Sequence, residues 1–286
     1  MSKKYVGTHL SYSKANPLAT VEAMTNVGAE AAAIFMNGAH TTNTSLLKPA
    51  IARSFRNKLK TILPCNDLLL PHAGFPINLA SHKGNIFHNS KTVFKSELAS
   101  AEQFGCGVVF HPGSAVDKNK PRGIAQIADA LNDMLPLYEA TAIIETMGGK
   151  KDGNVIGSSF EEIAGIINRI HDKEKIGVCI DTCHMFIGGY DIREEKKFDA
   201  IMRDFDRIIG LKYLCGIHLN DSKYDLGSGR DVHMAIGKGK IGESAFKFLM
   251  NDPRFDNMPI ITETHLGIPS AIKAELAYVR GLARKA

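Results

Sequence analysis

The sequence contains no Trp, and none of its apolar runs approaches the roughly 18 residues that a membrane-spanning helix needs. No apolar stretch follows the lysines near the N-terminus, so a secretory signal is not expected. The five cysteines are an odd number in a long chain, and most lie in apolar runs, where reduced core thiols are expected. These absences favour an intracellular, cytoplasmic protein without a membrane segment.

The net charge of the chain excludes few classes of protein. The formal net charge is +5 and the pI is near 8.8, which permits an anionic partner without requiring one. The chain also lacks a linker, a low-complexity tract and an internal repeat of about 20–50 residues. We therefore expect a single domain that spans residues 1–286 and acts as a monomer.

Eight short apolar runs recur along the chain, each followed by a turn and an amphipathic stretch of helical period. This alternation predicts an α/β fold, a single TIM (β/α)8 barrel with its active site at the C-terminal ends of the strands. An open doubly wound sheet often has a glycine-rich phosphate loop after its first strand, and none is present here. The predicted strands cover residues 5–10, 31–36, 67–71, 107–110, 140–144, 176–180, 213–217 and 258–262. The predicted helices cover residues 17–27, 49–61, 91–104, 123–135, 160–171, 196–208, 243–250 and 272–282.

Side chains that can bind metal stand at the ends of six predicted strands, on the side where a barrel has its active face. These residues are His72, His111, Glu145, Asp181, His218 and Glu263. His184 follows three residues after Asp181, beyond a predicted turn. The long loop after the seventh strand adds Asp231 and His233, whose side chains point the same way in extended backbone.

One histidine at a strand end is more often a satisfied polar residue than a ligand. Five histidines and four carboxylates directed into one mouth, however, form a polar cluster whose burial is costly. Divalent ions bound to these side chains offset that cost. Nine candidates exceed the about four or five ligands of one zinc ion, so we expect two or three ions. Mixed imidazole and carboxylate ligands favour zinc, with manganese or iron as alternatives. Such a cluster is suited to the hydrolysis of a phosphate ester.

Basic residues concentrate in the loops that follow the strands, where they could meet phosphate groups. They are Lys118, Lys120, Arg122, Lys150, Lys151, Arg193, Lys223, Arg230, Lys238 and Lys240. A solvated charged rim is the alternative interpretation. His9 and His265 are also expected near the same mouth, either in a supporting role or as ordinary polar residues.

Five segments closely resemble the signatures of endonuclease IV, the trinuclear-zinc apurinic/apyrimidinic (AP) endonuclease family of base-excision DNA repair. They are LPHAGFPINLA (70–80), FHPGS (110–114), IDTCHMFIGGYD (180–191), HLNDSK (218–223) and DVHMAIGKGKIG (231–242). The similarity runs from about Val6 to the C-terminus. The segments are long and specific, so chance similarity does not explain them.

The resemblance implies three zinc ions with a distinct ligand set for each. His72, His111 and Glu145 would hold the first; Glu145, bridging, with Asp181, His218 and Glu263 the second; and His184, Asp231 and His233 the third. It also implies that Glu145 and Glu263 are catalytic. The expected reaction is hydrolysis of the phosphodiester 5′ to an abasic site, giving a 3′-hydroxyl, together with removal of 3′-blocking groups. The expected partner is double-stranded DNA with abasic sites or blocked 3′ ends.

The loops expected to contact DNA depart from the family pattern. Phe75 and Pro76 stand where many members carry a Tyr-Leu pair that wedges into the duplex, and both are apolar enough to wedge. His40 stands where members carry an inserted Arg, and Val232 replaces the Arg of Asp-Arg-His. The predicted DNA-contact residues are His40, Phe75, Pro76, Lys223 and Arg230.

Two other functions remain open from the residues. Related sugar isomerases and epimerases of the xylose-isomerase-like barrels hold one divalent ion with a Glu, Asp, His, Glu set, and this chain offers Glu145, Asp181, His218 and Glu263. In a single-metal site of that kind, the other five candidate ligands would have no metal ion to bind. A non-catalytic DNA-binding relative is the second alternative, and the intact ligand set argues against it.

Overall fold

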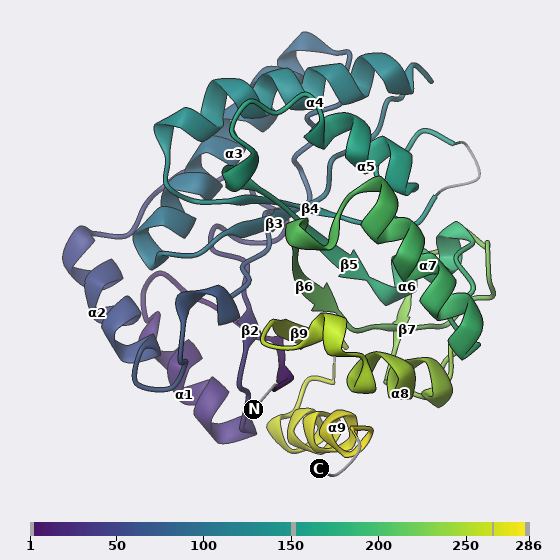
Figure 1. The fold of residues 1–286 in the computed structure, drawn as a ribbon. Coiled ribbons are helices and arrows are strands. Elements are labelled where there is room, and N and C mark those ends of the chain that lie inside the picture. The colour runs from purple at the N-terminus through teal and green to yellow at the C-terminus, as the bar shows by residue number, and fades with distance from the viewer. Residues whose placement is uncertain (1–2, 150–152, 265, 284–286) are drawn as a thin grey trace.

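The computed structural model describes residues 3–149, 153–264 and 266–283. Parallel strands occupy the centre of the molecule and helices surround them (Figure 1). Seven strands form one sheet in the order β2-β1-β9-β6-β5-β4-β3. They are β1 (Tyr5–His9), β2 (Ala32–Ala33), β3 (Val108–Phe110), β4 (Ala142–Glu145), β5 (Ile176–Asp181), β6 (Leu214–His218) and β9 (Pro259–Thr262). The predicted α/β architecture is confirmed.

The third predicted strand, 67–71, is irregular, and here the sequence prediction was partly wrong. Asn66–Leu68 form a short 3-10 helix, η1, and strand-like pairing is confined to residues 69–72. Isolated bridges link this segment to Ala32 in β2 and to Val109 in β3. A proline within the segment lacks the N–H that a regular ladder needs. The segment nevertheless lies between β2 and β3 and closes the sheet into a barrel.

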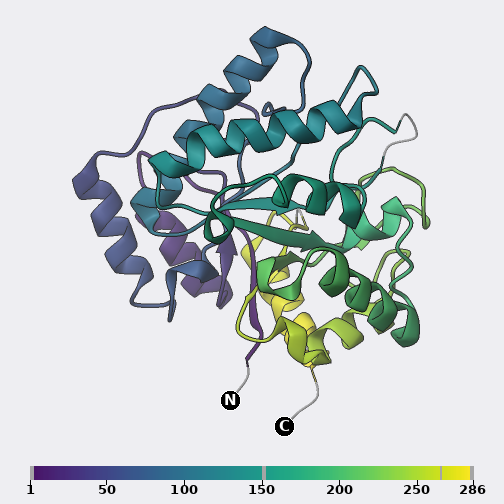
Figure 2. The same ribbon diagram turned by 45° about the horizontal axis from the view of Figure 1, so that its top comes forward.

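The helices pack around this sheet, as the two views of the ribbon show (Figures 1 and 2). They are α1 (Leu18–Val27), α2 (Pro49–Leu59), α3 (Gly84–Phe104), α4 (Lys120–Met134), α5 (Phe160–Ile167), α6 (Thr182–Gly188), α7 (Glu195–Ile208), α8 (Glu243–Asn251) and α9 (Pro269–Gly281). Short 3-10 helices also occur at Leu135–Leu137, Lys173–Lys175, Leu211–Tyr213 and Pro253–Phe255. The amphipathic stretches thus form the outer layer of the barrel.

Local sequence explains where these elements begin and end. In α5, Ile163, Ile166 and Ile167 are buried at helical spacing, and the Ser159 side chain caps the N-terminus by accepting from Glu162 N at 3.3 Å. Strands β4 and β5 are buried along their whole length, which their unbroken apolar runs predict.

The sequence also did not predict the true start of α3, helix α6 or a short antiparallel strand pair. Helix α3 begins seven residues before the predicted start at 91, because its first turns lie at the surface and carry no apolar stripe. Helix α6 replaces the turn expected after β5. The antiparallel pair β7 (Asp221–Ser222) and β8 (His233–Met234) is too short to give a sequence period.

Within the described ranges, no helix combines the length and the apolar character that crossing a membrane requires.

Candidate metal centre

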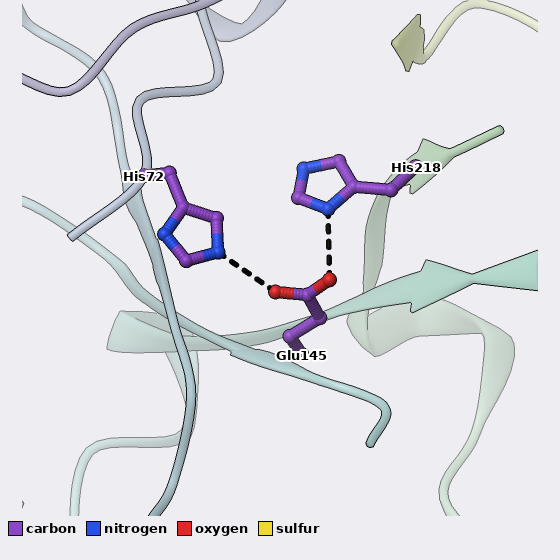
Figure 3. A group of neighbouring side chains, drawn as sticks. All are labelled: His72, Glu145 and His218. Atoms are coloured by element: carbon purple, nitrogen blue, oxygen red, sulfur yellow. Dashed lines mark hydrogen bonds and ion pairs between the residues drawn. The ribbon is translucent and has the colours of Figure 1, made fainter. Parts of the chain in front are cut away.

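Glu145, the last residue of β4, lies at the centre of a group of buried imidazoles. One carboxylate oxygen, Oε2, is 2.8 Å from His72 Nε2 and 3.0 Å from His111 Nε2. The other oxygen, Oε1, is 2.9 Å from His218 Nδ1. Figure 3 shows the rings of His72 and His218 each directed at a different oxygen of Glu145. A single carboxylate therefore faces two separate sets of nitrogen donors.

A second group gathers around Asn220, which follows β6. Its Nδ2 donates to Asp181 Oδ2 at 2.6 Å and to Glu263 Oε2 at 2.9 Å, and its Oδ1 accepts from Glu263 N at 3.0 Å. Asn220 thereby holds two carboxylates that would otherwise repel each other. One possible ligand atom from each of Glu145, Asp181, His218 and Glu263 lies within 4.8 Å of the others.

A third group is formed by His184, Asp231 and His233, whose ligand atoms also lie within 4.8 Å of one another. Asp231 lies between two imidazoles, with Oδ2 3.1 Å from His184 Nε2 and Oδ1 3.2 Å from His233 Nε2. Cys183 lies nearby, with its sulfur 3.8 Å from Asp231 Oδ1. The structure therefore brings all nine predicted ligands to the C-terminal mouth of the barrel.

The tautomers of two imidazoles are set by backbone carbonyls. Nδ1–H of His72 donates to Ala73 O at 2.7 Å, and Nδ1–H of His184 donates to Thr146 O at 2.9 Å. Each ring then turns the lone pair of Nε2 towards a carboxylate oxygen. Two lone pairs about 3 Å apart need a cation between them, either a proton or a metal ion. Metal-binding histidines are typically oriented in this way, so the donor set fits divalent ions.

The charges of the group are strongly coupled. Burial alone raises the pKa of Glu145, but His218 and His111 outweigh it and hold the pKa well below its usual value. Burial lowers the pKa of His184 and His218, yet nearby carboxylates and, for His218, the Cys179 thiol raise it well above the ordinary value. In the metal-free protein, the ionised form of Glu145 and the protonated forms of His184 and His218 therefore stabilise one another.

Seven of the nine residues line a cavity of about 900 Å³, and the other two, Asp181 and His218, are buried and outside its lining. Among the described residues that line it there is no Lys or Arg, so fixed cations do not balance its carboxylates. Phe75 stands at the mouth with 47% of its surface exposed, and its ring centroid lies 5.3 Å from His40 and 5.6 Å from His111. Pro76 is exposed beside Phe75, outside the cavity lining.

The predicted basic loops divide into two kinds. Lys120, Arg122 and Arg193 pair with local carboxylates and do not present free charge. Lys223 and Arg230 are exposed, and both stand over the Tyr224 ring, at 6.0 and 3.9 Å from its centroid. Lys150, Lys151 and His265 lie outside the described residues.

Sequence reasoning missed Asn220, Thr146 and Tyr224. Asn220 and Thr146 act through hydrogen bonds to ligands on other strands, and nothing in their own segments reveals such partners. Tyr224 lies between the two basic residues predicted to contact DNA, which is a signal that the sequence does contain. His9 lies at the mouth, with Nδ1 3.5 Å from Glu263 Oε1.

The fold and the site together define a class, a parallel TIM barrel with a candidate multi-metal centre at the C-terminal ends of its strands. Residues 21–282 match the family described as the xylose isomerase-like TIM barrel. The apurinic-apyrimidinic endonuclease of Caenorhabditis elegans is 38% identical over 272 residues, which cover 93% of this chain and 67% of that protein.

Two further comparisons agree. Apurinic-apyrimidinic endonuclease 1 of Plasmodium falciparum is 37% identical over 267 residues, and the match spans 92% of this chain but less than half of that protein, 44%. The crystal structure of endonuclease IV from Thermus thermophilus superposes with a TM-score of 0.83 at 29% identity, covering 97% of this chain and 98% of the other. The chain therefore belongs to the xylose isomerase-like TIM barrel family, within which it groups with the apurinic-apyrimidinic endonucleases.

Proposed function

We propose that the protein is a metal-dependent AP endonuclease that hydrolyses the phosphodiester 5′ to an abasic site in double-stranded DNA and removes blocking groups from 3′ ends. The observation that carries this proposal is the position of Glu145. Its two oxygens face different imidazole sets, which is what a carboxylate that bridges two ions requires. A single-metal enzyme has no use for the second set.

Three zinc ions per chain are the proposed complement. His72 and His111 would hold one ion with Glu145, and the groups around Asn220 and Asp231 would hold the other two. The ligand sets are His72, His111 and Glu145; Glu145, Asp181, His218 and Glu263; and His184, Asp231 and His233. Ions bound there would supply an acidified water and positive charge for the phosphate oxygens.

The protein's own groups would position the ligands and the substrate. Asn220 fixes the orientation of Asp181 and Glu263 by its three hydrogen bonds, so these carboxylates need not reorganise during the reaction. Glu145 and Glu263 are the proposed catalytic residues, since both line the cavity that would admit the phosphate.

The proposed DNA contacts lie around the mouth. Phe75, backed by the His40 ring and followed by Pro76, offers an apolar edge to the gap left by a missing base. Lys223 and Arg230 would meet phosphates from the opposite loop. We further propose that the chain acts as a monomer and forms one domain.

Sugar isomerisation remains the second candidate, because the family includes that chemistry in its name and the Glu145, Asp181, His218, Glu263 group alone could hold one ion. The two functions differ in metal content. Two or three ions per purified chain support the nuclease, whereas one ion supports the isomerase.

The test is an incision assay with a duplex that carries one tetrahydrofuran abasic analogue. We expect a metal-dependent cut 5′ to the lesion that a chelator abolishes. The Glu145→Ala variant should lose metal affinity and activity together. The loss should exceed the ~10–100-fold that follows removal of a residue hydrogen-bonded to a metal ligand, because Glu145 is itself a proposed ligand. Circular dichroism should still show a folded barrel. Absence of the cut, or unchanged metal content in the variant, contradicts the proposal.

A further inference from the structure

Glu97 on α3 is a buried carboxyl group that lies outside the metal centre. It is 1% exposed, and among the described residues no Lys or Arg forms an ion pair with it. Burial raises the pKa of Glu97 to about 7, although Gly74 and Asn37 act in the opposite direction. Burying a carboxyl group without a cationic partner is costly, so its neighbours need explanation.

These neighbours come from three different loops at the mouth of the barrel. Gly74 N, after the irregular strand, donates to Glu97 Oε1 at 3.4 Å. The Asn37 side chain, after β2, helps to lower the pKa of Glu97, although within the described residues its Nδ2 donates no hydrogen bond of ordinary geometry. Lys14, after β1, donates to Asn37 Oδ1 and to the carbonyl oxygen of Ser45. Glu97 is therefore bonded directly to the third loop, and beside it Lys14 joins the first loop to the second.

Above these hydrogen bonds the second and third loops are in direct backbone contact, and together we call residues 37–41 and 73–76 the lip. Phe75 N donates to Ala39 O at 2.8 Å. A Cβ on Gly74 would lie 3.0 Å from the carbonyl oxygen of Gly38, which is closer than most side chains tolerate. A side chain at position 74 would push the two loops apart by a few tenths of an ångström, so glycine favours their close approach.

The lip carries Phe75 and His40, two of the proposed DNA-contact residues. Both line the cavity and both are largely exposed. Because both side chains are exposed, few apolar contacts restrain them on the side that faces the solvent. The position of the Phe75 ring is therefore set from the inner side, by the backbone of the lip together with the rings of Phe35, His72 and His111.

We propose that Glu97 is a positioning residue that holds the lip, through Gly74, in the conformation that meets the gap in lesion-containing duplex DNA. The role of the lip in lesion binding rests on the proposed function. The geometric part, that Glu97 orders the lip, does not.

The absence of Trp in the sequence provides a direct test of the geometric part. Phe75→Trp places a single tryptophan on the lip, and its quenching by acrylamide is measured in the metal-loaded protein without DNA. Adding Glu97→Ala should raise the quenching constant about twofold, because the lip loses its buried anchor. Glu97→Gln keeps an acceptor for Gly74 N and should restore most of the protection.

Glu102→Ala is the matched control, since Glu102 lies on the same helix, is exposed, and its side chain accepts from Glu139 N at 2.9 Å, away from the lip. It should leave the quenching unchanged. If Glu97→Ala lowers thermal stability while the quenching constant stays that of the parent, Glu97 is merely structural and the proposal is overturned.

The functional part is tested with Phe75 intact. Glu97→Ala should raise KM for the abasic duplex about tenfold and change kcat less than about twofold, with metal content unchanged. An unchanged KM overturns this part. If the parent protein does not incise the duplex at all, the proposed function fails, and the quenching experiment still decides whether Glu97 orders the lip.

Discussion

Glu145 and Glu97 are the same residue type, equally buried, and yet they have opposite electrostatic character. The imidazoles around Glu145 hold its pKa well below the usual value, whereas burial raises the pKa of Glu97 to about 7. The difference arises from the neighbours, since histidines surround one and an amide, a backbone N–H and a distant lysine approach the other. Glu145 is therefore suited to bind cations and Glu97 to hold loops.

Metal binding should release protons from the imidazoles. Burial lowers the pKa of His233, but Asp231 and Asp181 raise it to about 9. In the metal-free protein the resulting stabilisation is present below the ordinary pKa of about 6.5 and is lost as the pH rises through about 9. A metal ligand must be neutral, so zinc affinity should increase over this pH interval.

The proton count can be measured by calorimetric titration of zinc into metal-free protein, in buffers of different ionisation enthalpy. We expect more than about one proton released per chain near neutral pH, and about one fewer for His233→Gln. Zinc binding without proton release contradicts the raised pKa values.

At the scale of elements, α6 shows how a short helix can place a ligand. Asp181 ends β5 and is also the N-cap of α6, where its Oδ1 accepts from His184 N at 2.7 Å. Gly189, in the left-handed conformation at φ 111°, ends the helix after about two turns. The spacing Asp-x-x-His is thus the spacing of a capped first turn, which directs the two side chains to different metal groups.

This capping function can be separated from ligand function by comparing Asp181→Ser with Asp181→Ala. Both variants lose the carboxylate and should lose metal to a similar extent. Serine still caps the helix, so the metal-free serine variant should be more stable by about 1 kcal/mol. Urea denaturation of the metal-free proteins measures this difference, and equal stabilities would show that the cap contributes nothing.

At the scale of the whole molecule, the candidate ligands stand on segments spread around the barrel. His72 belongs to the segment that closes the sheet between β2 and β3, and Glu263 follows β9 near the other end of the chain. Ions held by such distant segments would tie the barrel together, so metal binding and global unfolding should be coupled.

Thermal unfolding should therefore show one transition that shifts as a whole when the metal is removed. At a free zinc concentration of about 100 times Kd, each ion adds about 2.7 kcal/mol, which corresponds to a fall in Tm of roughly 5–10 °C per ion lost. Differential scanning calorimetry with and without a chelator measures this shift. Two transitions, of which only one responds to the chelator, would contradict the proposal of a single domain.

The sequence by itself determined the barrel and the order of its strands, because unbroken apolar runs alternate with amphipathic helices and this pattern is local. It also placed the candidate ligands at the mouth, since a residue at the end of a parallel strand must lie at that edge. The irregular third strand, the start of α3 and helix α6 were missed or misjudged, because an exposed turn or a short capped helix leaves no hydrophobic period.

Only the tertiary structure decided how the site is divided and supported. The two oxygens of Glu145 face residues 73 positions away in either direction along the chain. Under the lip, hydrogen bonds join Lys14 to Asn37 and Gly74 to Glu97. Such contacts depend on the distance and orientation of side chains from separate elements. No local pattern encodes them, because they exist only once the barrel has closed.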